Sequence, residues 1–171
     1  MSSMILQEAV EMTKLLRIYL ETTMFNYYFD EDREAHPDTV RMFEEIAADK
    51  YEAYTSEHVV SELKRASNED KRNKMLDLIM KYGISVLKPN AKASKLADIY
   101  IAEGVIPEDH HTDALHIAIS SVNGIDVILS LNFKHIVSKR TEEMTGNINM
   151  QNGYRRVDIR PPTEVVGNER V

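Results

Sequence analysis

The stretch Asp113 to Ile136, DALHIAISSVNGIDVILSLNFKHI, joins a nearly all-apolar helix pattern to the pattern of a buried strand. Apolar residues lie almost all round the first half, which predicts a helix packed between a sheet and neighbouring elements. Asn123-Gly124 is typical of a helix end, and Asp126 to Leu131 reads as a strand. A carboxylate, Asp113, opens the helix, and an amide, Asn132, follows the strand. Open α/β proteins place ligands and catalytic groups at such positions.

The rest of the chain alternates between strand and helix patterns. Strands are predicted at 17–21, 51–55, 84–88, 126–131 and 157–160. Helices are predicted at 38–48, 75–82, 91–102 and 113–122, and one more helix is predicted to start after an N-cap at Thr55 or Ser56. Lys139 to Met144 is expected to form one helical turn, and Gly146 to Gly153 a turn-rich loop. The alternation predicts an α/β fold, a three-layer α/β/α sandwich around a central, mostly parallel twisted sheet.

Length and composition are those of one ordinary globular domain. The 171 residues are 43% hydrophobic and 29% charged, enough for one core and short for two. We expect a single domain at 17–166, a polar tail at 167–171, and an N-terminal extension at 1–16 that is disordered or a short helix. No apolar run nears the roughly 18 residues of a membrane helix, and no secretory signal is evident. We therefore expect a cytoplasmic protein.

Several function classes are excluded by residue types. The chain has no cysteine, which rules out disulfides, thiolate metal sites and cysteine nucleophiles. The formal net charge of −7 argues against non-specific wrapping of nucleic acid, which needs clustered basic groups. No glycine-rich phosphate-binding motif is present, so nucleotide binding of that kind is not supported.

Polar residues nevertheless gather where a site is expected. Glu21 ends the first strand and Asn132 follows the fourth, so a parallel sheet places both at one edge. Glu62 lies two helical turns after the second strand, and Asp113 starts a helix that faces the same cleft. Three carboxylates and an amide suit Mg²⁺ or Mn²⁺ rather than Zn²⁺. Such an ion could activate water and neutralise charge on a phosphate.

Each of these residues also has an ordinary structural interpretation. Glu21 could be an exposed strand end, Glu62 a surface glutamate, and Asp113 a helix-capping aspartate. His116 is expected to be a hydrogen-bonded core or interface histidine rather than a ligand. The pair His110-His111 is a weak metal signal, because it has no matching ligand at i+4.

Taken together, the motifs resemble the PIN-domain family, in particular its bacterial and archaeal toxin-like (VapC-type) branch, whose members cleave RNA using Mg²⁺ or Mn²⁺. The resemblance spans Arg17 to about Val166. It is carried by Tyr19-Leu20-Glu21-Thr22-Thr23, Ser61-Glu62-Leu63, Asp113-Ala-Leu-His-Ile-Ala118, Ser130-Leu131-Asn132-Phe133-Lys134-His135-Ile136, Asn147-Ile-Asn149 and Ile159-Arg-Pro-Pro162.

The resemblance implies a metal-dependent endoribonuclease. Glu21, Glu62 and Asp113 would be metal ligands, directly or through water, and Asn132 would orient water or a ligand. Thr23 and Ser130 would donate hydrogen bonds to the site. Two positions depart from the family pattern, because Glu21 replaces an aspartate and Asn132 replaces a fourth acid. A catalytically weakened or inactive interaction module is therefore the alternative, and a nuclease acting on flap or single-stranded DNA is a third.

The resemblance also implies partners. Family members often form homodimers, and many are toxins neutralised by an antitoxin peptide that lies across the cleft. RNA would be contacted by the segment 64–74, whose five basic and two acidic residues give a local charge of +3, and by basic residues after the fourth strand. The candidate contacts are Lys64, Arg65, Lys134, Lys139 and Arg140. Ordinary surface solubility is the alternative interpretation of these cations.

Overall fold

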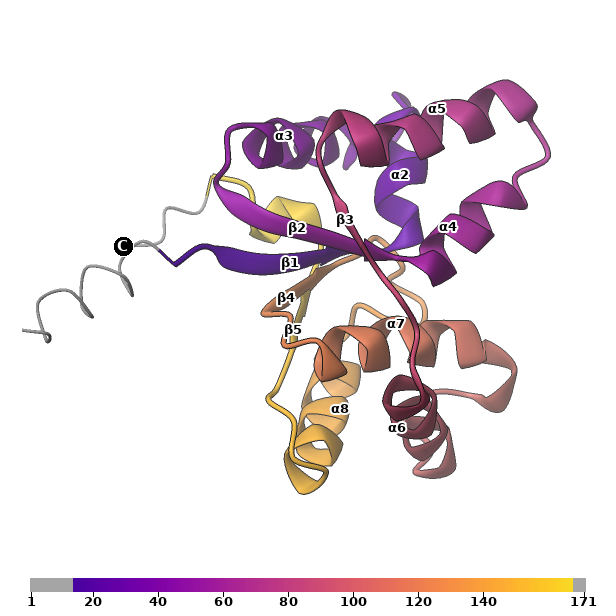
Figure 1. Ribbon diagram of the computed structural model, residues 1–171, viewed down its shortest axis with the longest axis vertical. Helices are drawn as coiled ribbons and strands as arrows, with labels where there is room; N and C mark the ends of the chain where they lie inside the picture. Colours follow the sequence, from indigo (N-terminus) through magenta and orange to yellow (C-terminus); the bar gives the residue numbers. More distant parts are fainter. Residues whose placement is uncertain (1–13, 168–171) are drawn as a thin grey trace, which may run out of the picture.

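The structure is a computed structural model that describes residues 14–167 (Figure 1). The expectations for the segment before residue 14 and for the tail after residue 167 lie outside the described residues. Within residues 14–167, no helix is long and apolar enough to cross a membrane.

The sheet has five parallel strands in the order β3-β2-β1-β4-β5. The central strand β1 pairs with β2 on one side and with β4 on the other, with Ile18 opposite Ala53 and Val127. Its last three residues and all of β4 are buried, as expected for strands covered on both faces. The strands are β1 (Leu16–Leu20), β2 (Tyr51–Ser56), β3 (Ser85–Leu87), β4 (Val127–Leu129) and β5 (Asp158–Arg160).

Helices cover both faces of the sheet. One layer holds α2 (Thr22–Tyr28), α3 (His36–Ala47), α4 (Glu57–Lys64) and α5 (Glu69–Lys81), and the other holds α6 (Ala91–Ala102), α7 (His111–Val122) and α8 (Lys139–Gln151) (Figure 1). Two 3-10 helices, η1 (Glu108–His110) and η2 (Pro162–Glu164), complete the described elements. The predicted three-layer α/β/α sandwich is confirmed, and the sheet is wholly parallel.

The strand order explains the two layers. The chain moves from β1 outward to β3, and right-handed crossovers place α2 to α5 on one face. It then returns across the sheet to β4 and moves outward in the other direction, which places α6 to α8 on the opposite face. The reversal makes a topological switch point between β1 and β4, beside which open α/β sheets bind ligands. The segment Asp113–Ile136 is the α7–β4 unit of this return.

The helix α2 was not predicted, because Met24 and Phe25 read as a continuation of the first strand. The strand instead ends at Leu20, and the Glu21 side chain accepts a hydrogen bond from the Thr23 backbone N–H as the N-cap of α2. Met24 and Phe25 are fully buried from this helix. The apolar run is therefore real, but capping by Glu21 divides it between two elements.

The prediction for residues 139–153 was wrong beyond the first turn, because α8 continues to Gln151. Glycine and asparagine disfavour helix, but tertiary contacts override that preference here. Arg156 crosses α8 at Gly146, where an added Cβ would lie 2.5 Å from its Nη1 atom. Asn149 is fully buried, donates to Ser121 Oγ at 2.8 Å and to the Arg155 carbonyl at 3.1 Å, and accepts from the Tyr100 hydroxyl.

We expect Asn149→Ala to lower the free energy of unfolding by about 1–3 kcal/mol, because it removes the hydrogen bonds that a buried side chain makes to Tyr100, Ser121 and the Arg155 carbonyl. Urea denaturation measures the change. Gln151→Ala is the matched control, since Gln151 is exposed at the end of the same helix and its loss should cost no more than about 0.5 kcal/mol. Equal losses in the two variants would contradict the role given to Asn149.

Candidate functional site

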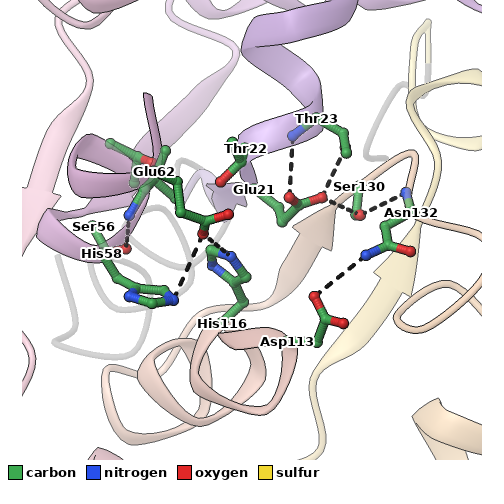
Figure 2. Close-up of polar contacts among 12 residues, drawn as sticks. Glu21, Thr22, Thr23, Ser56, His58, Glu62, Asp113, His116, Ser130 and Asn132 are labelled. Atoms are coloured by element: carbon green, nitrogen blue, oxygen red, sulfur yellow. Dashed lines mark hydrogen bonds and ion pairs between the residues drawn. The ribbon is translucent and has the colours of Figure 1, made fainter. Parts of the chain in front are cut away.

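Glu21 lies at the carboxyl end of β1 and is only 3% exposed. Its Oε1 atom accepts hydrogen bonds from Thr23 Oγ1 at 2.8 Å and from Ser130 Oγ at 2.6 Å, and Oε2 accepts from the Thr23 N–H at 3.1 Å (Figure 2). The interpretation of Glu21 as an exposed strand end is therefore wrong. Thr23 and Ser130 hold the carboxylate in one orientation, which removes the entropy cost of fixing it when a ligand binds.

Glu62 projects from α4 toward a buried histidine of α7. His116 is 1% exposed, and its Nε2 atom lies 2.7 Å from Glu62 Oε1. The other ring nitrogen, Nδ1, lies 2.8 Å from the Tyr19 hydroxyl, which is itself 2.8 Å from Ser56 Oγ. The prediction of His116 as a hydrogen-bonded core histidine is confirmed. Its partners make a polar chain from β2 through β1 and α7 to the carboxylate of Glu62.

The pKa values of Glu62 and His116 shift in opposite directions. Burial by itself lowers the pKa of His116, but the hydrogen bond to Glu62 and the negative charges of Glu21, Glu62 and Asp113 outweigh it and raise that pKa. Burial raises the pKa of Glu62, but the hydrogen bond and positive charge of His116 prevail and lower it. Each partner thus stabilises the charged form of the other.

Asp113 lies in the first turn of α7, where it makes no capping hydrogen bond; the N-cap is His110. The capping interpretation is therefore wrong. Asp113 Oδ1 instead accepts from Asn132 Nδ2 at 3.3 Å (Figure 2). Burial raises the pKa of Asp113, and although His116 opposes the shift, the negative charge of Glu21 adds to it. Burial and the charge of Glu21 thus disfavour the ionised form of Asp113 more than the neighbouring histidines favour it.

Asn132 connects the two ends of the α7–β4 unit. Its Nδ2 donates to Asp113, its Oδ1 accepts from the His135 N–H at 3.1 Å, and its own N–H donates to Ser130 Oγ at 3.0 Å. An ionised aspartate has no donor and would repel Asp113 across the same gap. The amide therefore stabilises the arrangement in a way that the fourth acid of the family pattern could not.

Figure 2 shows Glu21, Glu62 and Asp113 around His116, and the negative charge of each raises the pKa of that histidine. Their carboxylates do not form one compact ligand set. Among residues 14–167, two groups of three ligand atoms lie within 4.8 Å of one another, His58–Glu62–His116 and His110–Asp113–His135. An ion bound by all three predicted acids would need bridging water or side-chain movement.

The residues at this edge fit a divalent cation. Carboxylate and amide oxygens are the ligands that hard cations take. Thr22 Oγ1 lies between Glu21 and Glu62 (Figure 2); it is buried and has no partner at hydrogen-bond distance among residues 14–167, although it is near enough to Glu62 to help lower the pKa of that carboxyl. An orphaned buried hydroxyl is unusual in a folded protein and indicates a place for an ion or a bound water.

The sequence did not point to the histidines as neighbours of the acids. The available signal was their spacing, because His116 lies three residues after Asp113 and His58 four residues before Glu62, which places each pair on one helix face. His58 Nε2 lies 3.6 Å from Glu62 Oε1. Burial and the positive charge of His116 lower the pKa of His58, although Glu62 opposes the shift.

The predicted RNA-contact residues occupy two places. Lys64 and Arg65 are exposed at the end of α4, and Lys134 and Lys139 are exposed around the start of α8. Arg140 differs from them, because its guanidinium donates to the carbonyls of Gly104 and Val105 at 3.4 Å. Arg140 thus connects α8 to the turn after α6.

Two solved structures share the fold of this chain along most of its length. A chain in the crystal structure of VapBC2 from Rickettsia felis, bound to a DNA fragment from their promoter, matches with a TM-score of 0.53 and 12% identity over 84% of this chain and 97% of that one. VapC20 of Mycobacterium tuberculosis, a sarcin–ricin loop cleaving toxin, matches with a TM-score of 0.50 and 17% identity over 82% of this chain and 98% of that one. Comparison with protein-family models and with curated protein sequences gives no match. The chain therefore has the PIN-like fold of VapC toxins.

The His116–Glu62 pair predicts a specific pH dependence of stability. Because the folded-state pKa of His116 is raised above the ordinary value of 6.5, its contribution is complete below that value and is lost as pH rises through the folded-state pKa. We expect the free energy of unfolding to fall with pH in this window, and to fall less in His116→Gln. Denaturant unfolding at a series of pH values measures the slope.

The matched control for this slope is His111→Gln, which replaces an exposed histidine of the same helix. It should leave the pH dependence unchanged. A His116→Gln variant with the slope of the unmodified protein would contradict the coupling between His116 and the acids.

Proposed function

We propose that this protein is a Mg²⁺- or Mn²⁺-dependent endoribonuclease that hydrolyses phosphodiester bonds of single-stranded RNA, and that it is the toxin of a toxin–antitoxin pair. One observation carries the proposal. Carboxylates that follow β1, lie on α4 and start α7 are gathered around one buried imidazole beside the switch point between β1 and β4 (Figure 2). That is the edge at which open α/β sheets bind their ligands. The VapC-type fold supports the same chemistry.

In this proposal Glu21, Glu62 and Asp113 hold the cation, directly or through water, and Asn132 orients a ligand or a water. A bound divalent ion supplies an activated water and neutralises charge that builds on the phosphate. The protein's own contribution is to fix the ligands beforehand. Thr23 and Ser130 hold Glu21, and His116 holds Glu62 in its ionised form.

RNA contacts are proposed for the exposed cations on either side of the acids. Lys64 and Arg65 end α4, while Lys134 and Lys139 lie beyond Asn132. Lys139 also lines a groove of about 340 Å³ together with the exposed ring of Phe133. Phosphate oxygens pair with lysine and arginine, and an exposed ring offers a surface on which an unpaired base can stack. These contacts favour a single strand.

A homodimer and an antitoxin peptide are the proposed protein partners. The support is the VapC-type fold, which this chain shares with a VapBC2 chain along most of its length. An antitoxin that covers the acids would keep RNA from reaching them.

A second candidate function is a non-catalytic interaction module with the same fold. It is favoured by the hydrogen bonds that already occupy the acids, since Glu21 accepts three and Glu62 pairs with a buried histidine. A site whose acids are satisfied by protein donors can be stable without a cation. The two functions differ in whether the protein cleaves RNA.

The proposed activity predicts that the purified protein cleaves single-stranded RNA when Mn²⁺ or Mg²⁺ is present and stops when EDTA is added. Glu62→Gln and Asp113→Asn should each lower the cleavage rate by more than the roughly 10- to 100-fold that loss of an outer partner of a metal site costs. A labelled RNA oligonucleotide and the corresponding DNA oligonucleotide, resolved on denaturing gels, measure the rate and the substrate class.

Glu57→Gln is the matched control, because Glu57 is exposed in the first turn of the same helix as Glu62 and should keep full activity. Cleavage that survives both site variants or EDTA would overturn the metal mechanism. A folded protein that cleaves neither nucleic acid would favour the interaction module, and preference for the DNA strand would change the substrate class.

A further inference from the structure

A second group of potential metal ligands lies at the Asp113 corner of the site. His110 Nδ1 is 3.6 Å from Asp113 Oδ2, and the rings of His110 and His135 stack with their centroids 3.7 Å apart. One ligand atom from each of the three residues lies within 4.8 Å of the other two. All three side chains are partly buried, so they are shielded from solvent but reachable from it.

Two different segments bring these residues together. His110 ends η1 at the start of α7, and His135 lies in the turn after β4. Asn132 joins the segments, because its amide donates to Asp113 and accepts the His135 N–H. Asn132 Nδ2 donates its hydrogen bond to Oδ1 of Asp113. The Oδ2 atom, which faces His110, therefore remains available to another partner.

The other compact group has one unpartnered buried ligand atom, His58 Nε2, among residues 14–167, but its second histidine is not available to a metal. In His58–Glu62–His116, both ring nitrogens of His116 are already in hydrogen bonds, one to Glu62 and one to Tyr19. His116 is also nearly inaccessible to solvent. Neither restriction applies to His110 and His135, whose ring nitrogens have only contacts longer than a hydrogen bond or none among residues 14–167.

The donor set of the Asp113 corner selects the kind of ion. Two imidazoles and one carboxylate suit first-row transition ions, whereas Mg²⁺ prefers oxygen ligands and retains its water. At the position where the family pattern has a fourth acid, this chain has an amide and places two imidazoles beside it. The imidazole nitrogens would be neutral metal ligands at the place where the fourth acid of the family pattern would be a negatively charged one.

We propose that His110 and His135, together with Asp113, form an imidazole-rich half of the cation site and make it prefer Mn²⁺ or another first-row transition ion over Mg²⁺. This inference rests on the proposed function, because Asp113 is a metal ligand in both. It specifies which divalent ion the proposed nuclease would use. The alternative is a purely structural role, in which the two stacked rings hold the turn after β4 against the start of α7 and bind no metal.

The test is titration calorimetry of the full chain with Mn²⁺, Zn²⁺ and Mg²⁺ in separate experiments. The unmodified protein should bind Mn²⁺ and Zn²⁺ more tightly than Mg²⁺. His110→Gln and His135→Gln should each weaken Mn²⁺ and Zn²⁺ binding by about tenfold or more while leaving Mg²⁺ binding unchanged. His111→Gln, the matched control, replaces an exposed histidine that faces Asp98 and should change none of the three.

Wild-type affinity for Mn²⁺ and Zn²⁺ in both histidine variants would overturn the inference, as would an equal loss for all three ions. Thermal unfolding checks that each variant is folded. Because there are two separate variants, the test remains possible if one of them does not fold. RNA cleavage separates this inference from the proposed function. If the histidines bind transition ions but the protein cleaves no RNA, the proposed function is wrong and this inference stands. If the protein cleaves RNA in a metal-dependent way but the two histidine variants keep their metal affinities, this inference is wrong and the proposed function stands.

Discussion

The buried carboxylate of Glu21 ties together the carboxyl ends of the two central strands. Burying an ionised carboxylate is costly unless donors surround it, and here the donors come from the start of α2 and from the end of β4. The Glu21 N–H also donates to the Leu129 carbonyl at 3.1 Å, which continues the β1–β4 pairing past the strand end. One side chain therefore ends β1, starts α2 and places Ser130, which in turn accepts the N–H of Asn132.

The other two acids are held by the same principle with different partners. Glu62 is fixed by His116, and Asp113 by the amide of Asn132. Both departures from the family pattern have a physical role in this arrangement. The longer Glu21 side chain reaches donors on two elements, and Asn132 replaces repulsion with a hydrogen bond. Each acid is thus held by donors of the protein before any ion binds, which lowers the entropy cost of binding an ion that fits this arrangement.

Much of the fold could be predicted from the sequence, because the strands and α7 have strong local patterns. The helix bounds at α6 agree with the prediction, and β1, β2, β4 and β5 lie within two residues of their predicted bounds. The course of α8 could not be predicted, since its helix depends on Arg156 crossing Gly146 and on buried partners of Asn149. The sequence pattern predicted that the acids lie at one edge of the sheet. The positions of the histidines beside them could not be predicted, because they depend on how α4, α7 and the turn after β4 pack.

Both the proposed nuclease activity and the proposed preference for transition ions require a divalent cation bound at Asp113, at the edge between β1 and β4. Anomalous diffraction from crystals grown with Mn²⁺ tests it most directly, because the ion is located without reference to activity. We predict an anomalous peak within about 2.0–2.6 Å of the Asp113 carboxylate. A well-ordered crystal at millimolar Mn²⁺ with no peak at this edge, or with peaks only at surface acids, would show that Asp113 and its neighbours do not bind the cation.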